Sequence, residues 1–145
     1  MALLVFDIQN QICNQERRPR CIESVPKIVA LLEKARGAGI PVVHSLTSSA
    51  EGSDIRKEVT PVSGEPVVKS AVDKFYGTEL EDILKSKSVE TVILVRTSAH
   101  RAVLNTATGS AARGFNVVVP VDGNVGSRGL RRAVHRLASG QRAGD

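Results

Sequence analysis

Five short apolar runs alternate with longer amphipathic segments along the chain. The runs are rich in β-branched residues and continuous, without intervening polar positions, which is typical of strands buried on both faces. Strands of this kind belong to a parallel sheet that is covered on both sides. We expect them at residues 2–6, 41–45, 66–68, 91–95 and 116–121.

The segments between these runs have the spacing of helices. In the first segment, apolar residues follow an i, i+3, i+4, i+7 pattern behind a cap at Ser24. These apolar residues are Val25, Ile28, Val29 and Leu32. A second helix is expected behind a capping box formed by Thr78 and Glu81, and a third over residues 102–113.

Alternation of strands with helices predicts a single α/β domain over residues 1–145. Right-handed crossovers give a three-layer α/β/α architecture with a parallel, doubly wound, Rossmann-like sheet. Ligands bind beyond the carboxyl ends of the strands in such folds. Residues 46–65 are rich in Ser, Gly, Glu and Pro, so we expect a long loop that flanks the site.

Candidate chemistry stands at three of these strand ends. Asp7 follows the first strand, Lys69 follows the third, and the turn at residues 97–102 follows the fourth. A carboxylate beside an ammonium can act as an acid/base pair, because burial and charge shift the carboxyl pKa in opposite directions. The sequence therefore predicts that these residue types meet in one cavity.

Three motifs at the strand ends have a family pattern. Residues 3–10 read LLVFDIQN, residues 64–69 read GEPVVK with FYGTEL at 75–80, and residues 97–107 read TSAHRAVLNTA. In order and spacing they resemble the motifs of the isochorismatase-like hydrolases. The resemblance covers residues 2–123.

The resemblance assigns the catalytic positions of cysteine-using members to Asp7, Lys69 and Ala102. In those members the aspartate takes the thiol proton, the lysine orients and charges the pocket, and the thiolate attacks a carbonyl. An alanine methyl has no lone pair and no acidic proton, so acyl transfer through residue 102 is chemically impossible. The resemblance also implies an oxyanion hole from the backbone N–H groups of Ser98 and Ala102, and a cis peptide between Thr97 and Ser98.

A branch without the cysteine suggests the reaction. True isochorismatases are similar in placing a small residue at that position, and they cleave a vinyl ether with the aspartate as general acid. Ala99 and His100 before Ala102 resemble that branch. The residues that we expect to bind substrate are Gln9, Phe75, Ser98, His100 and Arg101.

Two basic residues depart from the family pattern. Lys74 directly precedes Phe75, where the family usually has a small residue, so we interpret Lys74 as solvated and leave the catalytic role with Lys69. Arg96 replaces a glycine that the family normally has after this strand. Because removing a guanidinium from water is unfavourable, we expect Arg96 either to reach an edge or to lower the stability.

No metal and no other cofactor is expected. The nicotinamidase branch of the family holds a metal through Asp-x-His, whereas residues 46–58 contain no histidine and His44 stands alone. Cys13 and Cys21 form no zinc pattern, so we expect two reduced thiols in a cytoplasmic protein. No apolar run is long enough to cross a membrane, and the N-terminus has no secretory pattern.

The net charge of +5 is concentrated near the C-terminus. Residues 126–145 hold five arginines and one aspartate, whereas residues 1–125 are nearly neutral. Aromatic residues make up 3% of the chain and no nucleic-acid motif is present, so we expect no nucleic-acid partner. Residues 124–145 are either the product of a shifted reading frame or a genuine helix with a basic outer face.

Two hypotheses for function follow. The first is an isochorismatase-like hydrolase that acts on a small polar metabolite by acid/base chemistry, with an isochorismate-like vinyl ether as the most consistent substrate. The second is a catalytically inactive family member that serves as a small-molecule-binding or structural oligomeric protein. In both cases the resemblance implies homo-oligomers, either dimers or larger assemblies.

Overall fold

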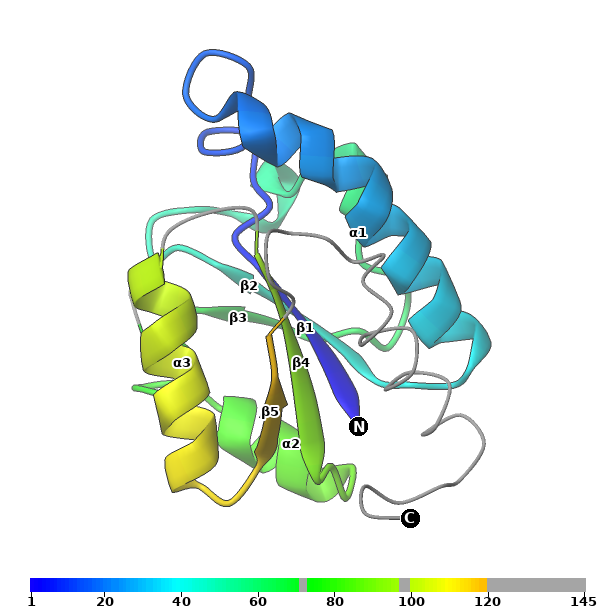
Figure 1. Ribbon diagram of the computed structural model, residues 1–145, viewed down its shortest axis with the longest axis vertical. Coiled ribbons are helices and arrows are strands. Elements are labelled where there is room, and N and C mark those ends of the chain that lie inside the picture. Colours follow the sequence, from blue (N-terminus) through cyan, green and yellow to red (C-terminus); the bar gives the residue numbers. More distant parts are fainter. Residues whose placement is uncertain (71–72, 97–99, 120–145) are drawn as a thin grey trace.

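A five-stranded parallel sheet organises the chain (Figure 1). The computed structural model describes residues 1–70, 73–96 and 100–119, with the side chains of the last range described from residue 105 onward. The order of the strands is β3-β2-β1-β4-β5. The elements are β1 Ala2–Phe6, α1 Pro19–Gly37, β2 Val42–Leu46, η1 Gly52–Asp54, η2 Lys57–Val59, β3 Val67–Lys69, α2 Leu80–Ser86, β4 Thr91–Arg96, α3 His100–Ala112 and β5 Asn116–Val118.

The strands form where continuous apolar runs were expected. Every residue of β1 and β2 is buried, which is the pattern of strands covered on both faces. Each of the five observed strands starts within two residues of the expected start. The first four also end within two residues of the expected end. The fifth strand ends at Val118, and the expected residues 120–121 lie outside the described part of the chain.

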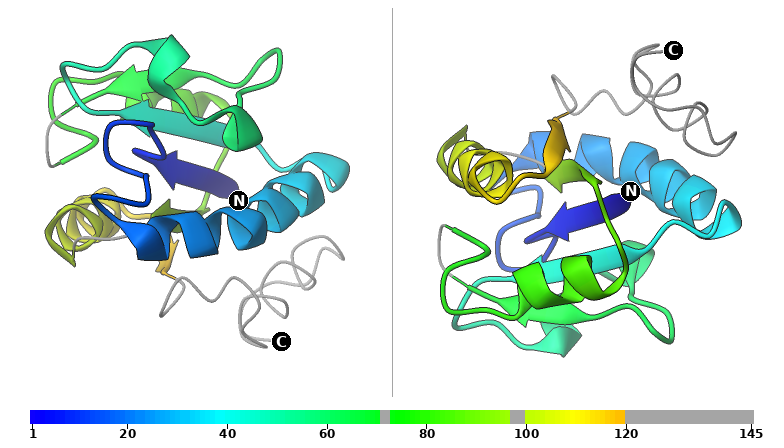
Figure 2. Two further views of the ribbon diagram at one scale, coloured as in Figure 1. Left: turned by 90° about the horizontal axis from the view of Figure 1, so that it is seen from above. Right: turned by 90° about the horizontal axis from the view of Figure 1, so that it is seen from below.

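Helices cover both faces of the sheet. Leu3 and Val5 of β1 pack with the inner side of α1 in one hydrophobic core. The alternate residues Leu4 and Phe6 pack with α2 and with Phe115 in a second core. Figure 2 shows α1 on one side of the strands and α3 on the other. The three-layer α/β/α architecture expected from the sequence is confirmed.

The first helix begins earlier than expected. It starts at Pro19, because proline suits the first helical turn, where its missing N–H group would have no partner in any case. Ser24 lies inside the helix, where its hydroxyl donates to the Arg20 carbonyl at 2.9 Å. The prediction of a cap at Ser24 is therefore wrong. The longer helix brings Cys21 onto the buried side of α1.

The topology has a switch point between β1 and β4. The chain builds β1, β2 and β3 in one direction and then places β4 on the other side of β1. Parallel pairing sets Phe6 beside Arg96, so the residues that follow β1 and end β4 meet at the carboxyl edge. Ligands bind at this position in doubly wound sheets. Of the helices that the structure describes, none is long and apolar enough to span a membrane.

Candidate active site

Asp7 occupies the carboxyl end of the central strand. It directly follows β1, its side chain is buried, and its backbone φ is 51°, a left-handed conformation that Asp tolerates better than most residues. Its N–H donates to the Ser45 carbonyl at 3.0 Å, and the Ser45 hydroxyl donates to Asp7 Oδ1 at 3.1 Å. Backbone strain of this kind is common at functional sites. The carboxyl group is therefore held firmly at the switch point.

Lys74 is the lysine that contacts Asp7. Its Nζ lies 2.9 Å from Asp7 Oδ1 and donates to the Ser70 carbonyl at 3.1 Å. The side chain is completely buried, so the prediction that Lys74 is solvated is wrong. The turn after β3 folds back over the carboxyl edge and carries Lys74 inward. Burial lowers the pKa of Lys74, and although the Asp7 charge opposes this change, the nearby Arg96 charge adds to it.

Lys69 does not reach the Asp7 carboxylate. β3 is the edge strand of the sheet, and within it Val68 is buried while Lys69 points outward. The Lys69 side chain is 41% exposed, and its Nζ pairs with Glu51 Oε2 at 2.9 Å. The expected meeting of Lys69 with Asp7 is therefore absent from this structure, because the alternation of side chains along β3 turns Lys69 away. Lys74, five residues later, takes that place.

Arg96 completes the charged cluster. It is the last residue of β4, its side chain is 10% exposed, and its Nη2 lies 3.4 Å from Asp7 Oδ2. Burial lowers the pKa of Arg96, whereas the Asp7 charge raises it and the Arg18 charge lowers it. Arg96 thus stays largely inside the protein and pairs with the central carboxylate. Its Nη1 atom is buried and has no hydrogen-bond partner among the described residues.

A family model and a curated relative match most of the chain. The isochorismatase domain matches residues 1–141. The secreted isochorismatase effector Isc1 of Verticillium dahliae is 34% identical over 141 residues, which cover 89% of this chain and 74% of the relative. The chain belongs to the isochorismatase-like hydrolase family.

Solved structures of the family share the fold. An isochorismatase-like hydrolase from Alkaliphilus metalliredigens is similar with a TM-score of 0.78 and 25% identity, over 95% of this chain and 89% of that chain. N-carbamoylsarcosine amidase from Thermoplasma acidophilum is similar with a TM-score of 0.77 and 25% identity, over 95% and 92% of the two chains. The expected family and its parallel sheet are therefore confirmed.

Gln9 and Phe75, which were expected to bind substrate, make contacts within the protein. Gln9 is buried and brackets Thr47, donating to its hydroxyl at 3.0 Å and accepting from its N–H at 3.2 Å. Phe75 lies in the hydrophobic core, stacked 6.2 Å from Phe115, while the neighbouring Tyr76 is exposed. Gln9 thus ties the loop after β1 to the end of β2, and the position of Phe75 favours packing.

Several family positions lie outside the described residues. These are the backbone of Ser98, the peptide bond between Thr97 and Ser98, and the side chains of His100, Arg101 and Ala102. The expected oxyanion hole, the substrate contacts of His100 and Arg101, and the place of the Ala102 methyl group beside Asp7 stay predictions. The tail at 124–145 also stays a prediction.

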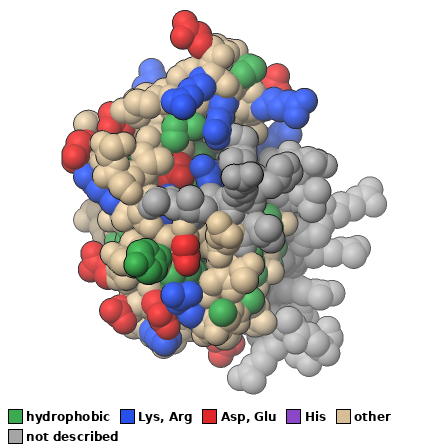
Figure 3. Space-filling model, turned by 90° about the vertical axis from the view of Figure 1, so that its left-hand side faces the viewer, with side chains coloured by type: hydrophobic (Ala, Val, Ile, Leu, Met, Phe, Trp, Pro, Cys, Tyr) green, Lys and Arg blue, Asp and Glu red, His purple; other side chains and the backbone are tan. Residues whose placement is uncertain are grey.

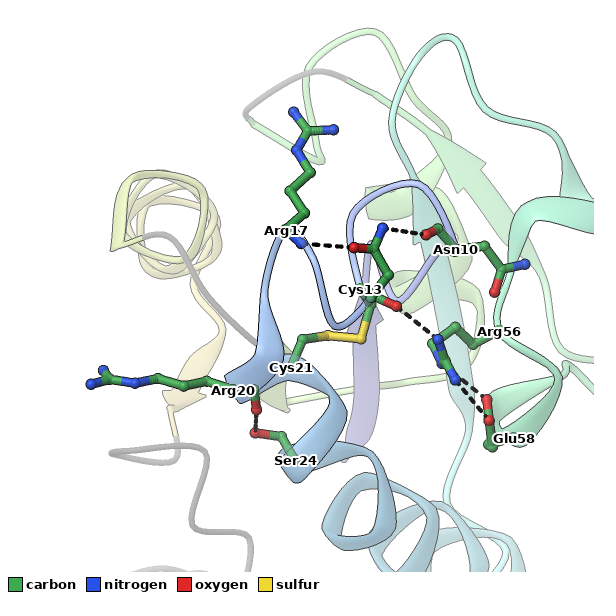
Figure 4. The surroundings of a disulfide bond; sticks show 9 residues. Asn10, Cys13, Arg17, Arg20, Cys21, Ser24, Arg56 and Glu58 are labelled. Atoms are coloured by element: carbon green, nitrogen blue, oxygen red, sulfur yellow. Dashed lines mark hydrogen bonds and ion pairs between the residues drawn. A yellow bond between two sulfur atoms is a disulfide. The ribbon is translucent and has the colours of Figure 1, made fainter.

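Cys13 and Cys21 form a disulfide bond, which contradicts the expectation of two reduced thiols. Their Cα atoms lie 5.3 Å apart, within the usual range for a disulfide. Figure 4 shows the bond joining the loop after β1 to the start of α1, with Arg56 donating to the Cys13 carbonyl at 2.7 Å. Disulfides are rare in the reducing cytoplasm, and the expected cytoplasmic location stays a prediction.

The described residues can be examined for metal-binding groups and for the distribution of surface charge. They contain no group of three or more His, Cys, Asp and Glu side chains close enough to hold a metal ion. On the face shown in Figure 3, basic and acidic side chains of the described residues are interspersed, without a continuous basic surface. The expected homo-oligomer and the absence of a nucleic-acid partner stay predictions.

Proposed function

We propose that this chain hydrolyses a small polar metabolite by acid/base chemistry, with Asp7 as the group that transfers the proton. The observation that carries the proposal is the buried contact of 2.9 Å between Asp7 Oδ1 and Lys74 Nζ at the switch point of the sheet. Family resemblance places alanine at position 102, where cysteine-using relatives keep their nucleophile. A reaction without a covalent intermediate fits that residue.

Hydrolysis of an isochorismate-like vinyl ether is such a reaction. The Asp7 carboxyl donates its proton to the terminal methylene carbon, which leaves an oxocarbenium ion. Water adds to the cationic carbon and returns a proton to the carboxylate, and the resulting hemiketal breaks into a ketone and an alcohol. No step needs a nucleophilic side chain, so the alanine methyl does not interfere.

Lys74 has a defined part in this proposal. Because burial lowers its pKa, the ammonium gives up a proton more readily than an exposed lysine. Its hydrogen bond to Asp7 Oδ1 holds this oxygen in place, and the positive charge stabilises the carboxylate that remains after Asp7 has donated its proton. The Ser45 hydroxyl holds the same oxygen and keeps the carboxyl oriented.

Purified protein incubated with isochorismate tests the proposal, with release of pyruvate followed by a coupled lactate dehydrogenase assay. Asp7→Asn keeps the size of the side chain and removes the proton donor, so we expect the rate to fall by about 10² to 10⁴. Asp54→Asn, whose carboxylate accepts from the Glu51 N–H in an exposed 3₁₀ turn, is the matched control and should keep full activity. Absence of turnover by the wild-type protein at high enzyme concentration would sink the proposal.

A ligand-binding protein without turnover is the second candidate. The observation that favours it is that both Asp7 oxygens already have cationic partners, Lys74 on Oδ1 and Arg96 on Oδ2. Saturable binding of isochorismate with no pyruvate release, under conditions where an active relative turns it over, would select this candidate.

A further inference from the structure

The site at the switch point has more positive than negative charge. Asp7 provides the carboxylate that both Lys74 and Arg96 face, and these two cations are its charged partners among the described residues. Arg18 adds a further positive charge near Arg96. Two buried cations thus share one buried anion. A second anion would balance the cluster.

The geometry of Arg96 indicates where that anion belongs. The 3.4 Å separation between Arg96 Nη2 and Asp7 Oδ2 exceeds the 2.7–2.9 Å of a charge-assisted hydrogen bond. Arg96 Nη1 is buried and unpartnered among the described residues. Folded proteins leave few buried polar groups without a partner, so this donor is unusual. The guanidinium retains the capacity to bind another acceptor.

Chemistry favours a carboxylate as that acceptor. The planar guanidinium presents paired N–H donors that match the two oxygens of a carboxylate, and it stays charged at any physiological pH. Arg96 also stands where the resemblance places a glycine, so this donor is a feature of this chain within the family pattern. A neutral acceptor would pair with this buried donor through a weaker hydrogen bond than a carboxylate.

We propose that Arg96 determines specificity by binding a carboxylate of the substrate through Nη1, beside the Asp7 carboxyl. The inference rests on the proposed function and concerns the same site. In an enolpyruvyl ether the carboxylate is attached to the carbon next to the reactive methylene. A carboxylate held by Arg96 therefore brings that methylene toward Asp7, because Arg96 already lies against the aspartate.

Binding of benzoate and of the isosteric neutral benzamide to the full-length protein tests this inference by calorimetry. We expect wild-type protein to prefer benzoate by about tenfold or more, the effect of one charge-assisted hydrogen bond. Arg96→Gln should abolish the preference. Arg96→Lys keeps the charge but loses the paired donors, so it should weaken benzoate binding.

Arg113→Gln is the matched control. Arg113 also pairs with a carboxylate, Glu81, and donates to the Gly109 carbonyl. It lies over the Phe75 ring, and its contacts among the described residues do not include Asp7, Lys74 or Arg96. This variant should bind benzoate like the wild type. Thermal unfolding checks each variant, and if Arg96→Gln does not fold, the comparison of Arg96→Lys with the wild type decides.

The outcomes separate this inference from the proposed function. Equal binding of benzoate and benzamide, or unchanged benzoate binding in the folded Arg96 variants, overturns the inference. Turnover of isochorismate with an unchanged KM in Arg96→Gln also overturns it and leaves the hydrolase proposal standing. Arg96-dependent benzoate binding in a protein that does not turn over isochorismate supports the inference and rejects the hydrolase proposal.

Discussion

Glu65 forms the centre of a second charged cluster, which is partly buried and joins the last turn of α1 to β2. It accepts from Arg36 Nε at 2.7 Å and Nη2 at 2.9 Å, and it lies 2.8 Å from His44 Nε2. Burial lowers the pKa of His44 despite the neighbouring carboxylate, so a neutral imidazole that donates its Nε2–H fits the arrangement. We expect Glu65→Gln to lower the stability markedly near neutral pH.

The size of the effect follows from the pKa of Glu65. Burial alone would raise this pKa, but the hydrogen bonds from Arg36 and His44 outweigh it and lower the pKa from 4.5 to about 2. At 1.36 kcal/mol for each pH unit, the difference corresponds to about 3 kcal/mol. Glu65 is only 8% exposed, whereas Arg36 is 28% exposed and partly screened by water. We therefore expect about 2–3 kcal/mol.

The pH dependence gives the prediction its sign. The folded-state pKa of Glu65 lies below the unfolded value, so the stabilisation is complete above pH 4.5 and is lost as the pH falls toward 2. The lowered pKa of His44 acts in the same direction from about pH 6.5 downward, because the unfolded chain binds that proton first. The advantage of wild type over Glu65→Gln should shrink to less than half by about pH 3.

Urea unfolding of both proteins at pH 7, 5 and 3 measures this advantage. Glu58→Gln is the matched control, since Glu58 also makes a two-pronged pair with an arginine, Arg56, but its side chain is 30% exposed. Pairs that water can reach contribute less than about 1 kcal/mol, and we expect this half-buried pair to contribute less than the Glu65 cluster. Equal losses in the two variants, or an advantage over Glu65→Gln that does not change between pH 7 and pH 3, would refute the reasoning.

Two further predictions concern the site and its loop. Lys74→Met leaves the Asp7 carboxylate without its closest cation and should lower the free energy of unfolding by about 3 kcal/mol. Lys69→Met removes an exposed pair, so its free energy of unfolding should stay within about 1 kcal/mol of the wild-type value. Urea unfolding measures both values, and a larger loss in Lys69→Met than in Lys74→Met would contradict the placement of the lysines. Replacing Cys13 and Cys21 together by serine should lower stability by about 2–3 kcal/mol, because the bond closes a chain separation of eight residues, and a reductant should destabilise wild type but not the variant.

The fold was predictable because the strands are buried on both faces. Short continuous apolar runs that are rich in β-branched residues favour strands covered on both faces, as in a parallel sheet under helices. Because these strands alternate with helices along the chain, only a few strand orders and connections were compatible with the sequence. The start of α1 was harder to predict, because no side-chain hydrogen bond caps Arg18 and a proline at the first helical position is a weaker signal than a serine cap.

The two errors near Cys21 have different causes, because the reduced thiols were expected from the assumed cytoplasmic location and not from the start of the helix. With the helix expected from Ser24, Cys21 belonged to a loop and had no defined direction. A start at Pro19 instead places Cys21 on the inner side of α1, buried opposite Cys13. The start of the helix, which the sequence left open, therefore affects whether Cys21 can reach Cys13.

The choice between Lys69 and Lys74 could not be made from spacing. Both lysines lie at or after the end of the third strand. The direction of the Lys69 side chain depends on the alternation of side chains along β3, and that of Lys74 depends on how the following turn folds back. That turn is held by the Ser70 hydroxyl, which donates to the Asp73 carbonyl at 2.6 Å, and by Thr78, which donates to the Lys74 carbonyl. Ser70 and Thr78, the hydroxyl residues at the two ends of this turn, are the sequence feature that could have indicated that the turn folds back.

The register of the sheet makes position 96 unusually influential. Because Phe6 pairs with Arg96 across two parallel strands, the residue after β1 and the residue that ends β4 are neighbours whatever their side chains. A glycine there would leave Asp7 with Lys74 as its one charged partner among the described residues, whereas arginine adds a second cation. A single substitution at the switch point can therefore change the charge that a ligand meets at this site. The fold stays the same, because it depends on the apolar residues of β1 and β4.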